Sequence, residues 1–211
     1  MYSENVAQEM KRWNDRFSAD GFVFGKEVNQ YLKDAALLHI PKNSRVLCVA
    51  DGEGRNSVWL AKNNYVVDAF DISEVGINKA KKFAQENSVN VHYELNDLDH
   101  FQWPENSYDA IACIFIQFAP PEMRQRAFEH MIKSLKPGGI LIVQGYTPKQ
   151  LEYKTGGPSI ESHLYTENLL KDSFKSLQIL DLKTYEAQLN EGAGHAGISA
   201  LIGMTAKKPI N

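Results

Sequence analysis

The sequence predicts an α/β protein whose sheet is mostly parallel and carries helices on both faces. From residue 45 to residue 145, short apolar, β-branched runs alternate with segments of helical periodicity, which is typical of parallel strands joined by helices. Two longer strand-like runs follow near the carboxyl end, and their short glycine-rich connection predicts an antiparallel pair. We therefore expect seven strands, of which only the last is reversed.

The strands are expected where an apolar run is bounded by polar or turn-forming residues. A stretch of ten residues, QLNEGAGHAG, separates the last two runs and is expected to be their connection. The seven predicted strands cover residues 45–50, 66–70, 90–95, 108–116, 140–145, 176–187 and 198–207.

The helices between these strands are expected where apolar residues recur at helical spacing. Pro120 and Pro121 suit the start of one of them, because the first backbone N–H groups of a helix have no internal partner. A loop rich in Gly, Pro and Ser covers 147–163. The predicted helices cover residues 54–62, 74–86, 121–135 and a segment near 166–173, after a largely helical segment at 1–40.

Charge and cysteine content argue against several classes of function. The chain has 211 residues and a formal charge of −3, and no run of Lys or Arg resembles a nucleic-acid footprint. No stretch approaches the ~20 apolar residues of a membrane span, and the charged amino terminus argues against a secretory signal. The two cysteines lie in apolar runs, where we expect inert free thiols in a reducing compartment and no metal site. We expect a cytoplasmic protein.

A glycine-rich loop, VADGEGRN at 49–56, follows the first predicted strand. Open parallel sheets bind ligands at this edge, beyond the carboxyl ends of their strands. Gly52 and Gly54 permit unusual backbone angles and a close approach to a ligand. The helix that follows offers free N–H groups to an anion or a carboxylate. Arg55 either pairs with a ligand carboxylate or binds Glu53 and the start of this helix.

Acidic side chains follow the next two strands as well. Asp71 ends the second strand, 20 residues after Asp51, where a carboxylate can accept hydrogen bonds from both hydroxyls of a ribose. An acid after the third strand can accept from the exocyclic amine of adenine, and apolar neighbours can enclose the ring. The residues expected to hold adenine are Asn96, Asp97, Leu98 and Ile72.

Three kinds of ligand compete for the glycine-rich loop. A phosphate fits poorly, because the pattern Gly-x₄-Gly-Lys-Ser/Thr is absent and Asp51 and Glu53 would repel it. The same acids suit a ligand that carries an ammonium and a sulfonium. A dinucleotide fits in part, since Gly52, Gly54 and Ser57 give Gly-x-Gly-x-x-Ser. Against it, the chain has little room for a separate substrate domain.

The order of GEGRN, FDIS, NDLDHF, YDAIACIF and LKPGG, closed by the antiparallel pair, resembles the class I S-adenosylmethionine-dependent methyltransferases over nearly the whole chain. WNDRF (13–17), GFVFGKEVNQYL (21–32) and EGAGHAG (191–197) resemble a small bacterial group named by analogy with tellurite-resistance and thiopurine methyltransferases. The resemblance implies a Rossmann-like fold, S-adenosylmethionine as cofactor and S-adenosylhomocysteine as product. One departure is the opening of the first motif, where Cys48-Val49-Ala50 replaces the usual acid-x-Gly; Ala50 is still small enough for close backbone approach.

The resemblance also implies how the chain is divided and which residues meet the cofactor. It implies one domain, with a helical lid at 1–40, a cofactor-binding half at 41–147, and a substrate-side loop, helix and hairpin at 148–211. The expected cofactor contacts are Trp13, Arg16, Gly25, Ala50, Asp51, Gly52, Glu53, Gly54, Arg55, Asn56, Asp71, Ile72, Asn96, Asp97, Leu98 and Cys113.

The reacting side of the site is expected at the ends of the later strands. Gln117 is polar inside an apolar run after the fourth strand, and Tyr146 follows the fifth. A hairpin between a sixth strand and a reversed seventh must turn at the same edge, which brings Glu191 and His195 near the site. We expect catalytic roles for His195, Gln117 and Tyr146, with strand-end packing or bracing of the hairpin as the alternative. His163 lies on a loop that could fold over the acceptor.

The expected function is methyl transfer from S-adenosylmethionine to a small molecule, such as a thiol or another soft nucleophile. Two alternatives stay open at this point: a small nicotinamide-dependent (NAD(P)) oxidoreductase, and a non-catalytic module that binds S-adenosylmethionine or S-adenosylhomocysteine. The expected partner is the methyl acceptor, without nucleic acid, membrane or metal, and the oligomeric state is left open.

Overall fold

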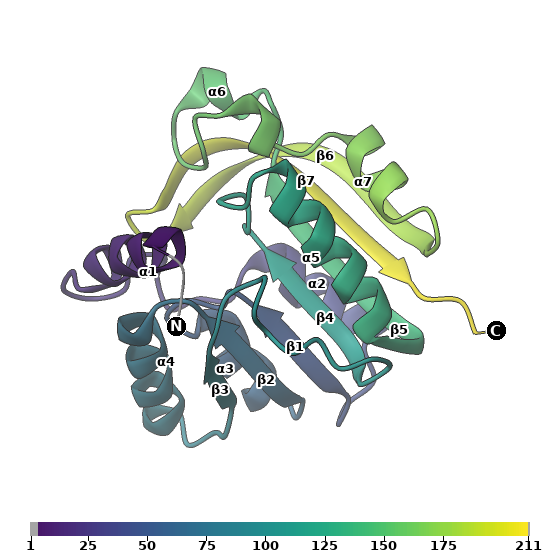
Figure 1. Ribbon diagram of the computed structural model, residues 1–211, viewed down its shortest axis with the longest axis horizontal. Helices are drawn as coiled ribbons and strands as arrows, with labels where there is room; N and C mark the ends of the chain where they lie inside the picture. Colours follow the sequence, from purple (N-terminus) through teal and green to yellow (C-terminus); the bar gives the residue numbers. More distant parts are fainter. Residues whose placement is uncertain (1–3, 211) are drawn as a thin grey trace.

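The computed structural model describes residues 4–210, which form a seven-stranded sheet in the order β3-β2-β1-β4-β5-β7-β6 (Figure 1). The first five strands pair in parallel, and β7 lies antiparallel between β5 and β6. The predicted fold class is therefore confirmed. The strands are β1 (Arg45–Val49), β2 (Val66–Asp71), β3 (His92–Leu95), β4 (Tyr108–Ile114), β5 (Leu135–Tyr146), β6 (Gln178–Glu191) and β7 (His195–Lys207).

Helices cover both faces of this sheet, because the strand residues alternate between two apolar cores. On β1, Leu47 and Val49 face the core under α5 and α7, whereas Val46 and Cys48 face the core under α2 and α3. Figure 1 shows α5 in front of the sheet and α2 behind it. The helices are α1 (Glu4–Phe17), α2 (Gln30–His39), α3 (Arg55–Lys62), α4 (Glu74–Glu86), α5 (Pro121–Ser134), α6 (Gln150–Tyr153) and α7 (Glu167–Ser173), with a 3₁₀ turn, η1 (Glu161–His163).

Local sequence signals explain where several helices begin. Ser73 caps α4 by accepting a hydrogen bond from the N–H of Gly76 at 3.0 Å, and Thr166 caps α7 in the same way. Pro121 occupies the first turn of α5, where its missing N–H costs nothing. These short polar or proline signals fix the helix starts at the edge of the sheet that carries the site.

The structure differs from the expected boundaries at both ends of the later strands. The fourth strand stops at Ile114 rather than at residue 116, because Phe115 has a left-handed φ of 56°. The expected ten-residue connection shrinks to residues 192–194, since β6 and β7 remain paired from Gln178–Lys207 to Glu191–His195. The fifth strand begins at Leu135 rather than at residue 140, so the LKPGG motif lies within β5.

The segment at 147–163, which was expected to be a loop, contains the short helix α6 and the 3₁₀ turn η1. Within residues 4–210, no helix combines the length and the apolar character needed to cross a membrane. The division into a lid and two halves stays a prediction.

Candidate active site

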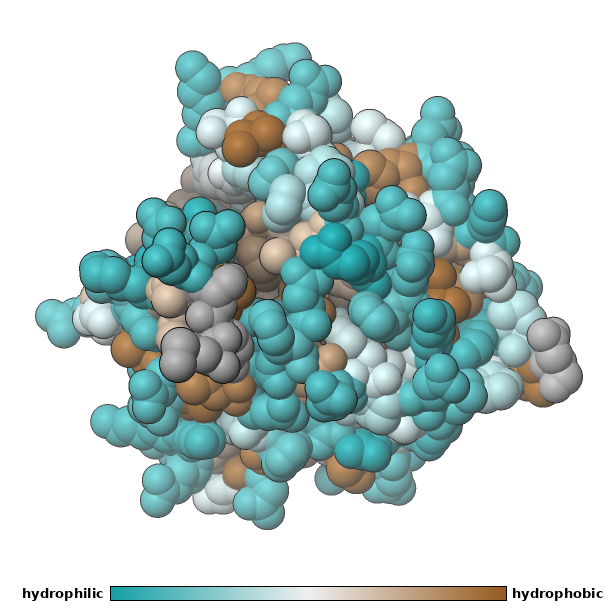
Figure 2. Space-filling view, in the orientation of Figure 1, coloured by the Kyte–Doolittle hydropathy of each residue, from teal (hydrophilic) through white to brown (hydrophobic). Residues whose placement is uncertain are grey.

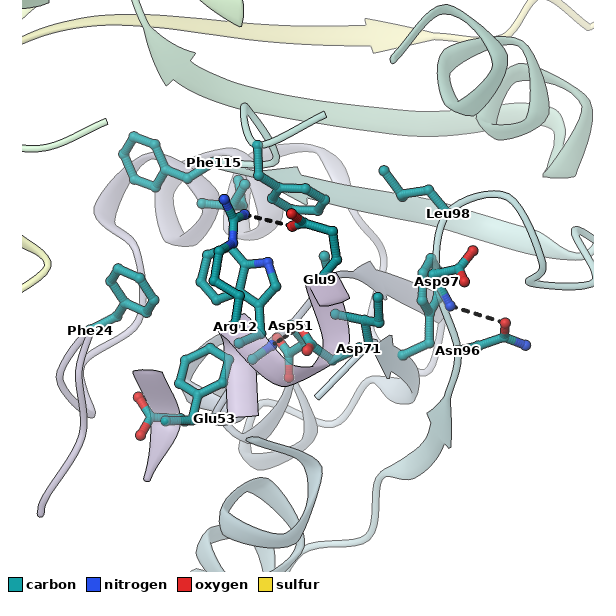
Figure 3. A pocket seen from close by; sticks show the side chains of 18 of the residues that line it. Glu9, Arg12, Phe24, Asp51, Glu53, Asp71, Asn96, Asp97, Leu98 and Phe115 are labelled. Atoms are coloured by element: carbon teal, nitrogen blue, oxygen red, sulfur yellow. Dashed lines mark hydrogen bonds and ion pairs between the residues drawn. The ribbon is translucent and has the colours of Figure 1, made fainter. Parts of the chain in front are cut away.

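The carboxyl ends of β1, β2, β3 and β4 surround a cavity of about 420 Å³. Helix α1 lies across it, and Figure 2 shows an apolar hollow on this face with hydrophilic side chains around it. In Figure 3, Glu9 and Arg12 of α1 reach over the pocket, with Asn96, Asp97 and Leu98 to one side. The cavity brings together many of the predicted cofactor contacts: Trp13, Gly25, Ala50, Asp51, Gly52, Glu53, Arg55, Asn56, Asp71, Ile72, Asn96, Asp97 and Leu98.

The glycine-rich loop is held by the half-buried carboxylate of Asp51. Ala50 takes a left-handed φ of 49° as the chain leaves β1, a strained conformation of the kind found at functional sites. The Asp51 carboxylate accepts hydrogen bonds from the hydroxyl and the N–H of Ser57, at 2.5 and 3.3 Å. Burial raises the pKa of Asp51 to about 7, and the nearby Asp71 adds to the rise. Asp51 therefore connects the loop to α3. This connection is present even though Cys48-Val49-Ala50 replaces the usual acid-x-Gly opening of the motif.

Asp71 ends β2 beside the same loop and is 6% exposed. Its two oxygens accept hydrogen bonds from the N–H of Gly52 at 2.9 Å and the N–H of Ser73 at 2.8 Å. Burial raises the pKa of Asp71 to about 6 despite these bonds. The carboxylate keeps lone pairs for a ligand, because two oxygens offer about four acceptor sites.

The segment after β3 forms the far wall of the cavity. Asp97 accepts hydrogen bonds from the backbone N–H groups of Asp99 and His100, both at 2.9 Å. Leu98 is buried at the cavity wall, and the amide of Asn96 donates to Glu94 at 2.7 Å. The wall is thus apolar at Leu98 and carries a carboxylate next to it, a combination that fits an adenine ring.

Arg55 pairs with Glu191 and not with Glu53, which was one of its two expected partners. Its Nη2 forms an ion pair with Glu191 at 2.8 Å, and both side chains are nearly buried. Its buried Nη1 has no hydrogen-bond partner. Glu53 instead accepts from the N–H of Val23 at 2.7 Å and from Lys79 at 3.1 Å. An orphaned guanidinium nitrogen at the cavity is a ready donor for a ligand carboxylate.

Helix α1 is anchored over the cavity by one polar side chain and one ring. Asn14 accepts hydrogen bonds from the hydroxyl of Ser73 at 2.7 Å and from the N–H of Val75 at 3.2 Å. Trp13 stacks on the buried Phe17, with ring centroids 5.6 Å apart. The helix therefore docks on the start of α4, in the position expected for a lid.

A second cavity of about 480 Å³ adjoins the first. Arg12, Trp13, Phe24, Phe115, Phe118, His163 and His195 line both cavities, and all three predicted catalytic residues, Gln117, Tyr146 and His195, line the second.

His195 lies in the wall of this second cavity at the start of β7. Its ring lies between Phe24 and Phe115, with centroids 4.7 and 4.5 Å away, and its Nδ1 shares a hydrogen bond with the hydroxyl of Tyr146. Burial lowers the pKa of His195 to about 3, and the charges of Arg55 and Arg16 lower it further. The imidazole is therefore neutral at pH 7. Burial also raises the pKa of Tyr146, which stays protonated.

Gln117 braces the backbone around the second cavity. Its amide nitrogen donates to the carbonyl groups of Tyr146 at 2.9 Å and His163 at 3.2 Å, and its oxygen accepts from the N–H of Tyr146 at 2.6 Å. His163 Nδ1 lies 3.0 Å from the carbonyl oxygen of Gln117. These bonds occupy the amide and tie the end of β5 to the segment after β4, so a catalytic role for Gln117 stays a prediction.

Three expected cofactor contacts lie elsewhere. Cys113 is fully buried in the core between the sheet and α5 and does not reach the cavity. Gly54, with φ 89°, begins α3, and an added Cβ would lie 2.8 Å from that of Ala80, so helix packing is what requires this glycine. Arg16 lines only the second cavity.

Sequence reasoning missed several lining residues of the first cavity. The amphipathic pattern of α1 signals that one face is covered, but the residues that meet the cavity depend on how the helix docks. Phe70 follows the alternation of a strand, and Met123 follows the spacing of a helix. Both patterns are those of ordinary core residues, so no local signal in the sequence marks these two as lining a cavity. The missed residues include Asn5, Val6, Glu9, Arg12, Phe17, Phe70, Asp99, Ile114, Pro120 and Met123. Among residues 4–210, no group of three or more His, Cys, Asp and Glu is arranged to hold a metal ion.

Residues 46–139 match the family model described as a methyltransferase domain. The chain is 29% identical over 125 residues to the ubiquinone biosynthesis O-methyltransferase of Coxiella burnetii, covering 59% of this chain and 49% of that protein. It is 25% identical over 173 residues to the tRNA N(3)-cytidine methyltransferase METTL2 of Danio rerio, covering 70% and 49%. The chain thus spans about half the length of the curated relatives it matches.

Solved structures share the fold. TehB from Haemophilus influenzae gives a TM-score of 0.70 at 21% identity, over 95% of this chain and 67% of that one. The N-methyltransferase NodS from Bradyrhizobium japonicum, in complex with S-adenosylhomocysteine, gives 0.72 at 14% identity, over 98% and 100%. The nicotinamide-dependent alternative is not favoured by these matches. Residues 46–139 are therefore similar to a methyltransferase domain, and nearly the whole chain shares its fold with solved structures such as TehB and NodS.

Proposed function

We propose that this protein transfers a methyl group from S-adenosylmethionine to a small-molecule acceptor, and that the acceptor is a soft nucleophile such as a thiolate. The observation that carries the proposal is the pair of adjoining cavities at the carboxyl edge of the sheet. The first holds the loop and strand-end residues of a nucleoside site, and the second offers an aromatic space directly beside it. Trp13, Phe115 and Phe118 line both and surround the junction.

The chain's own residues suit the cofactor at several points. Asp71 accepts from the ribose hydroxyls, and the unpartnered Nη1 of Arg55 donates to the carboxylate of the methionine part. Asp97 accepts from the adenine amine, and Ile72 and Leu98 enclose the ring. Bound there, S-adenosylmethionine supplies an electrophilic methyl group with a good leaving group.

Alignment and exclusion of water are then the main tasks of the protein. Helix α1 covers the junction of the two cavities, and the ring of Trp13 meets that of Phe118 edge to face at 5.7 Å. Among residues 4–210, no carboxylate side chain lines the second cavity, and the neutral His195 is a weak base at pH 7. An acceptor that enters already ionised needs no base, and a thiol, whose ordinary pKa is about 8.5, supplies a fraction of thiolate near neutral pH.

The finer assignment to the tellurite-resistance and thiopurine group rests on the motifs at 13–32 and 191–197, with the likeness to TehB as support for the fold. A small-molecule acceptor suits the size of the second cavity, about 480 Å³, whereas the METTL2 relative is named for a tRNA substrate. A screen for the methyl acceptor should therefore test tRNA as well as thiols, amines and carboxylates.

Calorimetric titration of the purified protein, cleared of carried-over ligand, tests the first step. We expect micromolar binding of S-adenosylhomocysteine and no binding of NAD. Turnover with thiols, measured as S-adenosylhomocysteine formed, is the expected second result. Binding without turnover on the whole panel would favour a non-catalytic module, turnover on tRNA alone would contradict a small acceptor, and binding of NAD alone would overturn the cofactor.

A further inference from the structure

We propose that the methyl acceptor is a planar organic anion whose negative charge is held by Arg16 at the mouth of the second cavity. This proposal rests on the methyl-transfer function proposed above and adds the chemical class of the acceptor. It depends on three features of the described residues: the charges that line the two cavities, the surroundings of Arg16, and the rings in the cavity wall.

The two cavities differ in the balance of the charges that line them. Two guanidinium groups, Arg12 and Arg55, line the first cavity against six carboxylates: Glu9, Asp51, Glu53, Asp71, Asp97 and Asp99. No Asp or Glu lines the second, whereas Arg12 and Arg16 both do. A cationic sulfonium is attracted to the first environment and an anion to the second. The segregation gives each ligand its own side of the site.

Arg16 is the guanidinium that is free to hold this anion. It lies in the last turn of α1, over the rings of Trp13 and Phe24 at 5.6 and 5.2 Å from their centroids. Arg12 is paired with Glu9 at 2.8 Å, but none of the ion pairs within residues 4–210 includes Arg16. Two rings therefore fix the position of the Arg16 charge without neutralising it, and a guanidinium binds a carboxylate through two parallel hydrogen bonds.

The walls of the second cavity favour a flat ligand. His195 is stacked between Phe24 and Phe115, and Phe115 lies 4.8 Å from the ring of Tyr146. Phe118 adds a further ring at the border with the first cavity. A planar acceptor gains offset or edge contacts with such rings, and its charged end points toward the mouth, where Arg16 lies.

Benzoate and benzamide are the matched probes, because they share a ring and differ in charge and carry no group that must react. Each is titrated into protein saturated with S-adenosylhomocysteine, and dissociation constants are measured by ligand-observed NMR. We expect benzoate to bind about tenfold or more tightly than benzamide, the range of a charged hydrogen-bonded contact. Arg16→Gln should abolish this preference, and Arg16→Lys should restore part of it. Lys175→Gln, which removes a positive charge away from both cavities, should keep it.

The outcomes separate this proposal from the function on which it rests. Equal binding of the two probes, no binding of benzoate, or an unchanged preference in Arg16→Gln would each overturn the proposal while S-adenosylhomocysteine still binds. Failure of S-adenosylhomocysteine to bind would instead contradict the proposed function. A preference that is lost equally in Lys175→Gln would show general electrostatic attraction and would also count against Arg16.

Discussion

Asp71 is the single side chain on which we expect cofactor affinity to depend most. Asp71→Ala removes the charged acceptor for the ribose hydroxyls, and such bonds contribute about 1.5–3 kcal/mol each. We therefore expect S-adenosylhomocysteine to bind at least about tenfold more weakly, measured by calorimetry. Asp68→Ala is the matched control, since this acid lies on the same strand but pairs with Arg45 at the far edge. Equal losses in both variants would contradict the assignment.

His195 is expected to act as a neutral side chain rather than as a titrating base. Because its pKa is lowered to about 3, it contributes no inflection near pH 6.5 to the rate. His195→Asn should lower turnover and leave S-adenosylhomocysteine affinity within about twofold, because the ring lies between Phe24 and Phe115 at the acceptor side. The measurement is a pH–rate profile of both forms. An inflection near 6.5 that vanishes in the variant would show that His195 does titrate there.

Single residues also show how far the sequence alone can predict the site. Asp71 and Asp97 could be predicted to share an edge, because parallel topology brings the carboxyl ends of strands together whatever their side chains do. The partners of Arg55 and Gln117 could not, since Glu191 lies far along the chain from Arg55 and Gln117 is bound to a backbone 29 residues away. Their contacts follow from packing, which leaves no local periodicity.

Among the elements, the β6–β7 hairpin contacts both the segment between α1 and α2 and the start of α3. The N–H of Gly194 donates to the carbonyl of Val23 at 3.0 Å, and Glu191 binds both Arg55 and the amide of Asn29. The sequence predicted the turn at the correct edge but not its length. The turn begins where the pairing of β6 and β7 ends, after thirteen paired positions. This end point depends on both strands together and not on the residues of the turn alone.

Gly192→Ala is expected to uncouple this hairpin from the segment before α2. Gly192 has a φ of 68°, and an added Cβ would lie 2.4 Å from the carbonyl oxygen of Val23. Left-handed φ costs an alanine about 1–2 kcal/mol, and the backbone clash adds to this. Gly21→Ala is the matched control, because its φ is 76° but its Cβ would meet nothing within 4 Å.

Thermal unfolding and turnover measure the difference between the two glycine variants. We expect Gly21→Ala to lower the melting temperature by a few degrees, at about 2–4 °C per kcal/mol for a chain of this size. Gly192→Ala should lower it by at least about twice as much and should also reduce turnover. Equal melting temperatures in the two variants would mean that the hairpin adapts without cost.

At the scale of the whole molecule, the directions of the strands could be predicted, because alternating strands and helices favour parallel pairing and a short connection favours an antiparallel pair. The division of charge between the two cavities could not, because it arises where α1, the strand ends and the hairpin meet. The acids gathered in the first cavity make the stability of the whole protein depend on pH, because burial changes their pKa values between the unfolded and the folded state.

We expect Asp51 and Asp71 to make the ligand-free protein less stable as the pH rises from about 4 to about 7, whereas His195, whose pKa is lowered to about 3, acts in the opposite direction below pH 6.5. Asp51 and Asp71 have ordinary pKa values of 3.8, which burial raises to about 7 and about 6 in the folded state. Between these values the two acids bind more protons in the folded protein than in the unfolded chain, so their contribution to the free energy of unfolding falls with rising pH, by up to about 1.4 kcal/mol per pH unit for each proton. This stabilisation is complete below pH 3.8 and is lost as each folded pKa is passed.

Melting temperatures of the ligand-free protein, measured from pH 5 to pH 7.5, give the slope of stability against pH, and Asp51→Asn should flatten this slope. Asp109→Asn is the control: although burial opposes the shift, its bonds to Lys136 and to the N–H of Arg45 lower its pKa, so it titrates below this range and its loss should leave the slope unchanged. A slope that is the same in wild type and Asp51→Asn would show that Asp51 folds in its charged form.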